Sequence, residues 1–278
     1  MLAVLRLPKE EATVPVTVRD IRAFKQRGER FTMLTAYDAS QAQLLDRAGI
    51  PLLLVGDTLG MTVLGYPTTV PVTMEDMLHH TAAVTRGTRN ALVVGDLPFM
   101  SYQVSIEEGM HNAGRFLKEA GAHAVKLEGG RPVVDLVDRL TDIGIPVMGH
   151  LGLTPQSVNQ IGGFRVQGRI EEESERILTD AKDLEAAGIF ALVLEAVPAA
   201  LGKAVTEAVS VPTIGIGAGP HCDGQVLVFH DFLGMDTTQV SPRFVKRYAR
   251  LGEDIERAAR EFAAEVASGA YPAPEHSY

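Results

Sequence analysis

Acidic side chains end three separate strand-like segments of this sequence. Asp57 follows the apolar run LLLVG, Asp96 closes LVVGD, and Glu128 closes AVKLE. If these runs are parallel strands, their carboxyl ends meet at one face of the sheet and bring the three carboxylates together. Carboxylates held that close repel one another, so the cluster indicates a cation, a shared proton or a catalytic task. Their oxygens suit Mg²⁺ better than Zn²⁺, although a single strand-end aspartate can also cap a helix or form a turn.

Lys126, His150 and Glu195 belong to the same set of strand ends. Lys126 lies two residues before Glu128, so both side chains share one face of a strand. A lysine inside a barrel needs an anion, either a substrate carboxylate or a neighbouring acid. Glu195 ends the apolar run ALVLE and is the candidate general base, with an ion pair to Lys126 or His150 as the alternative. His150 could orient a ligand, donate a proton or only bond to the backbone.

Apolar, β-branched runs alternate with helical patterns along the chain, which is typical of βαβ units. Because no linker interrupts this alternation, it predicts one domain over residues 1–278, a single (β/α)₈ TIM barrel with its core at about 30–240. The eight candidate strands are residues 31–36, 51–56, 91–96, 124–128, 146–150, 191–195, 212–216 and 226–230.

Capping signals delimit the helices between these strands. Thr73 with Asp76, and Ser105 with Glu108, have the capping-box spacing. Four glycines each follow a helical pattern and precede a strand, as expected for a residue of positive φ. These are Gly49, Gly121, Gly144 and Gly188.

Both ends of the chain carry helical patterns outside the barrel. VRDIRAFKQRG, with Thr17 or Asp20 near its start, predicts a helix that plugs the amino end of the barrel. Ser241 as N-cap and Pro242 at the first helical position predict C-terminal helices over residues 241–266, followed by a loose tail at 267–278.

Long connections follow two of the predicted strands. Residues 57–73 and 151–170 are rich in Gly, Thr and Pro, which is typical of functional lids. The glycine-rich GIGAG at 215–219 is either a phosphate-binding loop or a tight packing turn. His79 and His80 are adjacent on a predicted helix, so they diverge and cannot chelate one ion.

Composition excludes several classes of protein. The net charge of -9 and pI near 5.4 argue against a nucleic-acid partner. The apolar runs are shorter than the roughly 20 residues that cross a bilayer. The start MLAVLRLPKEE lacks a secretory pattern, so we expect a cytoplasmic protein with no membrane partner. Cys222 is the single cysteine, which excludes an internal disulfide, and we interpret it as an incidental thiol.

Ordered motifs over roughly residues 15 to 240 resemble the ketopantoate hydroxymethyltransferase family. They are MLTAYDA, VGDTLGM, GDLPFMSYQ, AVKLEGG, GIPVMGHLGLTPQ, LVLEAVP and PTIGIGAG. The resemblance implies transfer of the one-carbon unit of 5,10-methylenetetrahydrofolate, the co-substrate, to 3-methyl-2-oxobutanoate. The product would be 2-dehydropantoate, in the first step of pantothenate synthesis. It also implies one Mg²⁺ per subunit, an enolate stabilised by that ion, and a homo-oligomer, with a decamer as one expected size.

The resemblance also assigns roles to individual residues. Its metal-binding acids correspond to Asp57, Asp96 and Glu128, and the first two of these also contact substrate. Its substrate-binding lysine corresponds to Lys126 and its catalytic base to Glu195. The family often has serine where this chain has Thr58, which keeps a hydroxyl for the substrate carboxylate. His150 takes a supporting role.

Two other functions are compatible with a metal-binding barrel. One is a Mg²⁺-dependent lyase that cleaves a C–C bond beside an oxo acid, or a phosphonate mutase. Such lyases often carry a K-x-C-G-H-type loop, which this sequence lacks. The other is a catalytically silent barrel, which should have lost some of the four assigned acids and the lysine, whereas this chain keeps all five residues.

Overall fold

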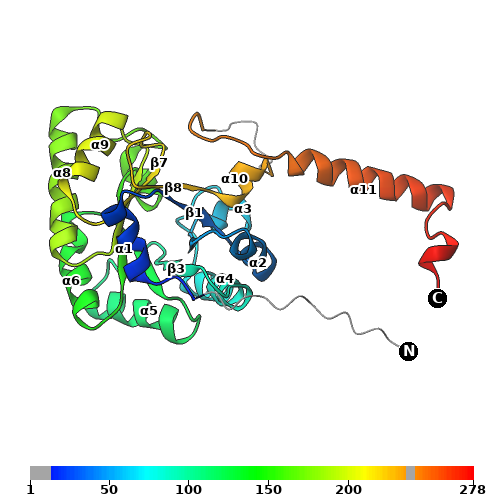
Figure 1. Ribbon diagram of the computed structural model, residues 1–278, viewed down its shortest axis with the longest axis horizontal. Coiled ribbons are helices and arrows are strands. Elements are labelled where there is room, and N and C mark those ends of the chain that lie inside the picture. The colour runs from blue at the N-terminus through cyan, green and yellow to red at the C-terminus, as the bar shows by residue number, and fades with distance from the viewer. Residues whose placement is uncertain (1–13, 236–241) are drawn as a thin grey trace.

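Eight parallel strands close into a barrel in the computed structural model, which describes residues 14–235 and 242–278. Each strand pairs with the next in sequence, and β1 pairs with β8 to complete the ring (Figure 1). The predicted (β/α)₈ architecture is therefore confirmed. The strands are β1 (Phe31–Thr35), β2 (Leu52–Val55), β3 (Leu92–Asp96), β4 (Ala124–Glu128), β5 (Val147–Gly152), β6 (Ala191–Glu195), β7 (Thr213–Ile216) and β8 (Gly224–Leu227).

Helices surround the barrel and follow most of its strands. Those from the start of the chain to β5 are α1 (Val18–Arg27), α2 (Ala39–Arg47), α3 (Leu59–Thr62), α4 (Met74–Gly87), α5 (Ile106–Lys118), η1 (Arg131–Val133) and α6 (Val134–Asp142). Those after β5 are η2 (Pro155–Ser157), α7 (Val158–Ile161), α8 (Glu171–Ala186), α9 (Ala199–Ala208), α10 (Phe229–Leu233), α11 (Leu251–Ser268) and η3 (Pro274–His276). The two long connections, residues 57–73 and 151–170, thus contain short helices. Within the described residues, none of the helices has the length and apolar character that a bilayer crossing requires.

The predicted helix signals have the expected geometry. Thr73 and Asp76 form a reciprocal capping box at the start of α4, and the Ser105 hydroxyl accepts a hydrogen bond from the Glu108 N–H at the start of α5. The four glycines that precede strands all have positive φ, between 71° and 95°. These turns return the chain to the barrel at the amino end of each strand, so every strand runs in the same direction.

Helix α1 closes the amino end of the barrel. Its N-cap is Thr17, in a capping box with Asp20. Ile21 is fully buried in the inner core cluster, which also contains the first residues of several strands, including Phe31 and Leu52. The predicted plug is therefore confirmed, and the apolar floor that it completes lies beneath the opposite, carboxyl end.

The last strand differs from its predicted range of 226–230. β8 spans Gly224–Leu227, and Phe229 begins α10. The strand can start at Gly224 because glycine has no side chain and so fits against the Phe31 ring. An added Cβ would lie 2.9 Å from a ring carbon. The Phe229 N–H donates to Thr35 Oγ1 at 2.8 Å instead of to a strand carbonyl. The apolar run VLVF therefore spans a strand end and a helix start, which periodicity alone does not separate.

The C-terminal helix also begins later than predicted. Ser241 lies outside the described residues, and residues 242–250 are irregular before α11 begins at Leu251. The Tyr248 N–H donates to the Phe232 carbonyl at 2.7 Å, so contacts with α10 hold this segment out of the helix. Helix α11 then extends away from the barrel (Figure 1).

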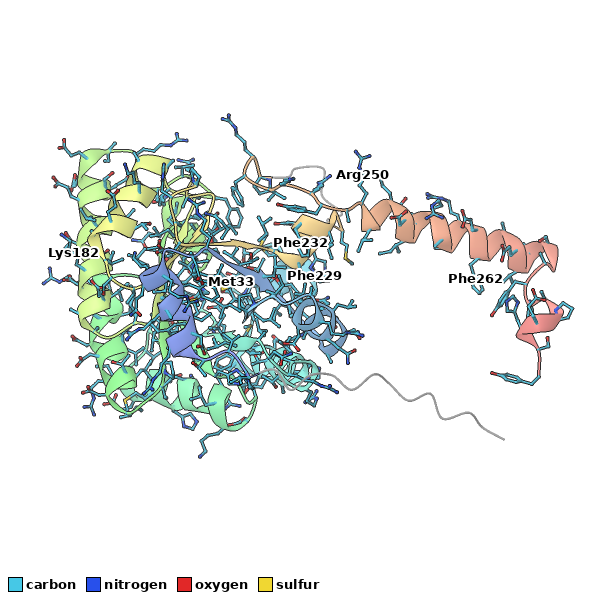
Figure 2. The ribbon with its side chains drawn as sticks, viewed as in Figure 1. Met33, Lys182, Phe229, Phe232, Arg250 and Phe262 are labelled. Carbon is cyan, nitrogen blue, oxygen red and sulfur yellow. The ribbon has the colours of Figure 1, made fainter. Side chains whose placement is uncertain are left out.

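The C-terminal tail, predicted as loose, contains the short helix η3. The Tyr271 ring packs on Phe262 of α11 with centroids 5.3 Å apart, which folds the tail back on the helix. Figure 2 shows Phe262 on the part of α11 that is far from the barrel.

We expect Ile21→Ala to lower the free energy of unfolding by about 2–5 kcal/mol, because it leaves a cavity in the floor of the barrel. Urea denaturation followed by circular dichroism measures the change. Arg19→Ala is the matched control, since Arg19 is exposed on the same helix and its loss should change stability by less than about 0.5 kcal/mol. Equal effects from the two variants would show that α1 does not seal the barrel.

Candidate active site

Side chains alternate between the two faces of each strand, and this alternation places the ionisable residues on the inside of the barrel. On β3, Leu92 and Val94 belong to the inner core cluster and Asp96 takes the next inward position. The same step of two leads from Ala124 to Lys126 and Glu128 on β4. Each strand is therefore apolar where it meets the floor of the barrel and ionisable where it reaches the carboxyl end.

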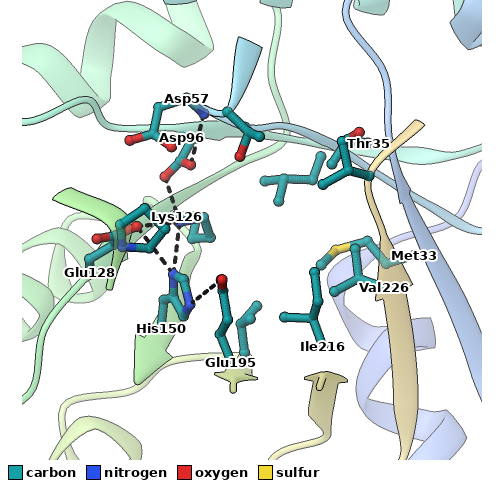
Figure 3. Close-up of a pocket in the computed structure, with 16 residues that line it drawn as sticks. Met33, Thr35, Asp57, Asp96, Lys126, Glu128, His150, Glu195, Ile216 and Val226 are labelled. Atoms are coloured by element: carbon teal, nitrogen blue, oxygen red, sulfur yellow. Dashed lines mark hydrogen bonds and ion pairs between the residues drawn. The ribbon is translucent and has the colours of Figure 1, made fainter. Parts of the chain in front are cut away.

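Three carboxylates meet at this end, as predicted. Asp57 follows β2, Asp96 ends β3 and Glu128 ends β4, and each is at most 6% exposed. The Asp57 N–H donates to Asp96 Oδ2 at 3.1 Å, which ties the first two acids together. Figure 3 shows all three around one side of the cavity.

Lys126 lies among these acids and is only 3% exposed. Its Nζ lies 2.8 Å from Asp96 Oδ1 and 3.7 Å from Glu128 Oε1. Strand register explains the first contact, because Lys126 pairs with Asp96 across β3 and β4. In the structure the lysine therefore has the neighbouring-acid partners that the sequence left as one of two alternatives.

His150 links Glu128 to Glu195. Its Nδ1 lies 3.4 Å from Glu128 Oε1, and its Nε2 lies 3.3 Å from Glu195 Oε2 without the alignment of a hydrogen bond. The Glu195 side chain is 18% exposed, more than the other acids of the site. Ala196, directly after it, has a φ of 46°, which is uncommon for a residue with a side chain and turns the backbone sharply at the end of β6.

Sequence reasoning missed two polar residues of the site. Gln156, in η2, donates from its side chain to Asp57 Oδ2 at 3.0 Å and from its backbone N–H to Glu128 Oε2 at 3.0 Å. The Tyr102 hydroxyl lies 2.7 Å from Gln156 Oε1. Both residues occur in motifs that resemble the family, TPQ and MSYQ, but neither follows a strand directly. Their position depends on loops folding back over the barrel.

A cavity of about 420 Å³, including its open mouth, lies over these residues. One side is ionisable, and the other is lined by side chains from β1, β7 and β8 (Figure 3). This apolar side includes Met33, Ile216 and Val226. Thr58, at the start of α3, also lines the cavity. Such a site suits a small molecule with an anionic end and a branched aliphatic end.

Burial and mutual repulsion shift the protonation of the acids. Burial, with the charges of Asp96 and Glu128, raises the pKa of Asp57 well above its usual range. Burial likewise raises the pKa of Asp96, although Lys126 opposes the shift. For Glu128, burial is outweighed by the hydrogen bond from His150 and the charge of Lys126, which lower its pKa.

The pKa values of the two basic groups of the site are both raised. Burial opposes the charge of Lys126, but the three carboxylates outweigh it and raise the lysine pKa. Burial and Lys126, whose Nζ lies 3.2 Å from His150 Nδ1, oppose the charge of His150, but its contacts with Glu128 and Glu195 raise its pKa to about 9. Four acidic and two basic side chains therefore line the cavity. A divalent cation would offset the repulsion between the acids.

The acids supply the donor set for a hard metal ion, although they are not arranged as a ready cage. Within the described residues, no group of three His, Cys, Asp or Glu side chains lies in a geometry that could hold a metal. Lys126 engages Asp96, while His150 and Gln156 engage Glu128. The buried Asp96 Oδ1 lacks a hydrogen bond of good geometry. Asp57 and Asp96, both at the cavity, are the best-placed residues to hold Mg²⁺.

The remaining sequence candidates lie outside the polar cluster. Gly217 and Gly219 of GIGAG have positive φ, and Gly219 packs so closely on Ala199 that an added Cβ would lie 2.5 Å from its methyl group. This favours the packing turn over a phosphate loop. Cys222 is buried in the outer core and does not line the cavity. His80 Nδ1 bonds to the Tyr37 carbonyl at 2.6 Å, while His79 is exposed.

Comparison with known proteins identifies the family. Residues 15–274 match the family described as ketopantoate hydroxymethyltransferase. The chain belongs to this family. Two relatives, both named 3-methyl-2-oxobutanoate hydroxymethyltransferase, come from Syntrophus aciditrophicus and Moorella thermoacetica. They are 58% and 59% identical, each over 95% of this chain, and the matches cover 96% and 97% of the relatives. The resemblance predicted from the motifs is confirmed.

Solved structures of low identity share the barrel of this ketopantoate hydroxymethyltransferase family member. A phosphonopyruvate hydrolase in complex with oxalate and Mg²⁺ has a TM-score of 0.62 at 14% identity, over 94% of this chain and 93% of its own. A 2,3-dimethylmalate lyase, a member of the PEP mutase/isocitrate lyase superfamily, has a TM-score of 0.58 at 13% identity, over 95% and 93%. At such identities the likeness shows the fold alone.

For this member of the ketopantoate hydroxymethyltransferase family, we expect Lys126→Met to lower the free energy of unfolding by about 3–5 kcal/mol at pH 7, because it leaves buried carboxylates without their cation. The deficit should shrink as the pH falls from 8 to 5, since the carboxylates then take up protons. Chemical denaturation across this range measures it. Lys182→Met, on the exposed face of α8, is the control. A deficit below about 1 kcal/mol at every pH would contradict the assigned ion pairing.

Proposed function

We propose that the protein transfers the one-carbon unit of 5,10-methylenetetrahydrofolate to 3-methyl-2-oxobutanoate and releases 2-dehydropantoate. The observation that carries the proposal is the division of the cavity: buried acids and Lys126 on one side, apolar side chains on the other, and Glu195 between them. Names of relatives at 58% and 59% identity support the same reaction. The anionic oxo-acid end suits the polar side, and the isopropyl end suits Met33, Ile216 and Val226.

The charged residues have separate roles in the reaction of the oxo acid. Asp57 and Asp96, with Glu128 beside them, would hold one Mg²⁺ per subunit, and Asp57 and Asp96 would also border the substrate. When bound, the ion supplies Lewis-acid stabilisation of the negative charge that develops on the keto oxygen. Lys126 Nζ, 3.7 Å from Glu128, and the Thr58 hydroxyl orient the substrate carboxylate.

Glu195 is the proposed base. Its greater exposure at the cavity lets its carboxylate reach the substrate and take the proton from C3. That carbon then forms the bond to the one-carbon unit, both C–N bonds of the folate methylene break, water supplies the hydroxyl oxygen, and tetrahydrofolate leaves. The His150 ring, whose Nε2 lies 3.3 Å from Glu195 Oε2, supports the base by orienting its carboxylate. The apolar side excludes water from C3, so the charge interactions around it are stronger than in solvent.

The main alternative, a lyase or phosphonate mutase on a similar barrel, has less support. The structures of that kind share only 12–17% of their residues with this chain. The cysteine loop typical of such lyases is absent from the sequence, and Cys222 lies away from the cavity. No feature of the site favours this chemistry over the transfer reaction.

The cellular location and the assembly of the protein are also part of the proposed function. We place the protein in the cytoplasm, where folate-dependent transfer would occur, and expect a homo-oligomer with a decamer as one candidate size. Exposed apolar side chains on α11 support self-association, since Ile255 and Phe262 are each 55% exposed.

The proposed reaction can be tested directly on the purified protein. Incubation with 3-methyl-2-oxobutanoate, 5,10-methylenetetrahydrofolate and Mg²⁺ should yield 2-dehydropantoate, detected by mass spectrometry. Addition of EDTA should abolish the product, and excess Mg²⁺ should restore it. Absence of product in the complete mixture would contradict the assigned reaction, while product that persists in EDTA would contradict only the metal requirement.

We expect Glu195→Gln to abolish proton abstraction but not binding, because the amide keeps the shape of the side chain and cannot accept a proton. Exchange of the C3 proton of 3-methyl-2-oxobutanoate into deuterated water, followed by NMR, should slow at least 100-fold. Calorimetry should show that the oxo acid still binds in the presence of Mg²⁺. Exchange at the rate of the unmodified protein would rule out Glu195 as the base.

A further inference from the structure

Gln156 joins two of the proposed metal ligands that come from strands without a common border. Asp57 follows β2 and Glu128 ends β4, with β3 between them. Gln156, 4% exposed, donates to Asp57 Oδ2 through its side chain and to Glu128 Oε2 through its backbone N–H, each at 3.0 Å. One residue of the loop after β5 thus engages one oxygen of each carboxylate.

The orientation of the Gln156 amide is determined by its other partners. Its Nε2 also donates to the Leu97 carbonyl at 2.9 Å, and its Oε1 lies 2.7 Å from the Tyr102 hydroxyl. The Tyr102 hydroxyl accepts a hydrogen bond from the Glu128 N–H at 3.1 Å and donates to Gln156 Oε1. A flipped amide would turn its oxygen toward the Asp57 carboxylate and the Leu97 carbonyl. Donation to Asp57 is therefore the only favourable arrangement.

This arrangement opposes the repulsion between the acids. Neighbouring carboxylates lower their energy by turning away from one another, and a cation that binds later must reverse that movement. Hydrogen bonds from Gln156 restrain one oxygen of Asp57 and one of Glu128 before a cation arrives. Ordering the ligands in advance strengthens binding, because less conformational freedom is lost at the binding step.

We propose that Gln156 is a positioning residue that holds Asp57 and Glu128 in place for the divalent cation, with Tyr102 fixing its amide. The proposal rests on the metal site of the proposed function. Gln156 touches the acids and acts through them. Its loss should therefore change the affinity for the cation more than the chemical step.

The decisive variant is Gln156→Met, which keeps the length of the side chain and removes its donors. Mn²⁺ serves as the probe, and calorimetry together with electron paramagnetic resonance measures its binding to the full chain without substrate. We expect the affinity to fall at least tenfold. At saturating Mn²⁺ the kcat should return to near that of the unmodified protein while the Mn²⁺ concentration for half-maximal activity stays raised, a pattern that general misfolding would not produce.

Gln160→Met is the matched control, because it makes the same chemical change at an exposed position of α7. It should leave the Mn²⁺ affinity within about twofold of the unmodified protein. Tyr102→Phe is the second variant, which keeps the ring and removes the hydroxyl that anchors the amide. It should weaken Mn²⁺ binding several-fold.

The outcomes separate the two proposals. If the unmodified protein binds no Mn²⁺, the proposed metal site is wrong and the role of Gln156 is wrong with it. If the unmodified protein binds Mn²⁺ and Gln156→Met binds it equally well, only the role of Gln156 is wrong. If Gln156→Met does not fold, Tyr102→Phe decides, and an unchanged affinity in that variant overturns the proposal.

Discussion

Closure of the barrel forces like charges together. Four acidic side chains reach the cavity from the ends of β2, β3, β4 and β6, and among the described residues that line it only Lys126 and His150 are basic. Removal from water makes this repulsion stronger than it would be at the surface. Much of the surrounding polar structure offsets it: Lys126 lies between Asp96 and Glu128, the His150 ring lies between Glu128 and Glu195, and Gln156 donates to two of the acids. The balance of charge at the site depends on these few contacts.

The same geometry gives the cavity a charged side and an apolar side, which have different roles. Strands β2 to β6 contribute charge, while β1, β7 and β8 contribute Met33, Ile216 and Val226. A reaction that develops negative charge beside an aliphatic group needs both surfaces close together, since donors stabilise the charge and the apolar side keeps water away. The barrel supplies this pairing without any large rearrangement of its strands.

Strand composition made the barrel and its ionisable strand ends predictable. Side chains alternate between the two faces of a strand, so once β3 and β4 are recognised, the faces on which Asp96 and Glu128 lie are determined. The start of β8 and the start of α11 were not predictable, because contacts with Phe31 and Phe232 decide them. Gln156 was missed for the same reason: its function follows from how a loop returns over β4, and no local pattern encodes that path.

The plug formed by α1 has a consequence for the order of events. With Ile21 and its neighbours sealing the amino end, the cavity communicates with solvent at the carboxyl end. In the proposed reaction, both substrates then use one entrance, and the smaller one must reach the deeper position beside Lys126 before the bulky folate covers the opening. A single entrance would thus make substrate binding sequential. The oxo acid would bind first, and the product 2-dehydropantoate would leave last.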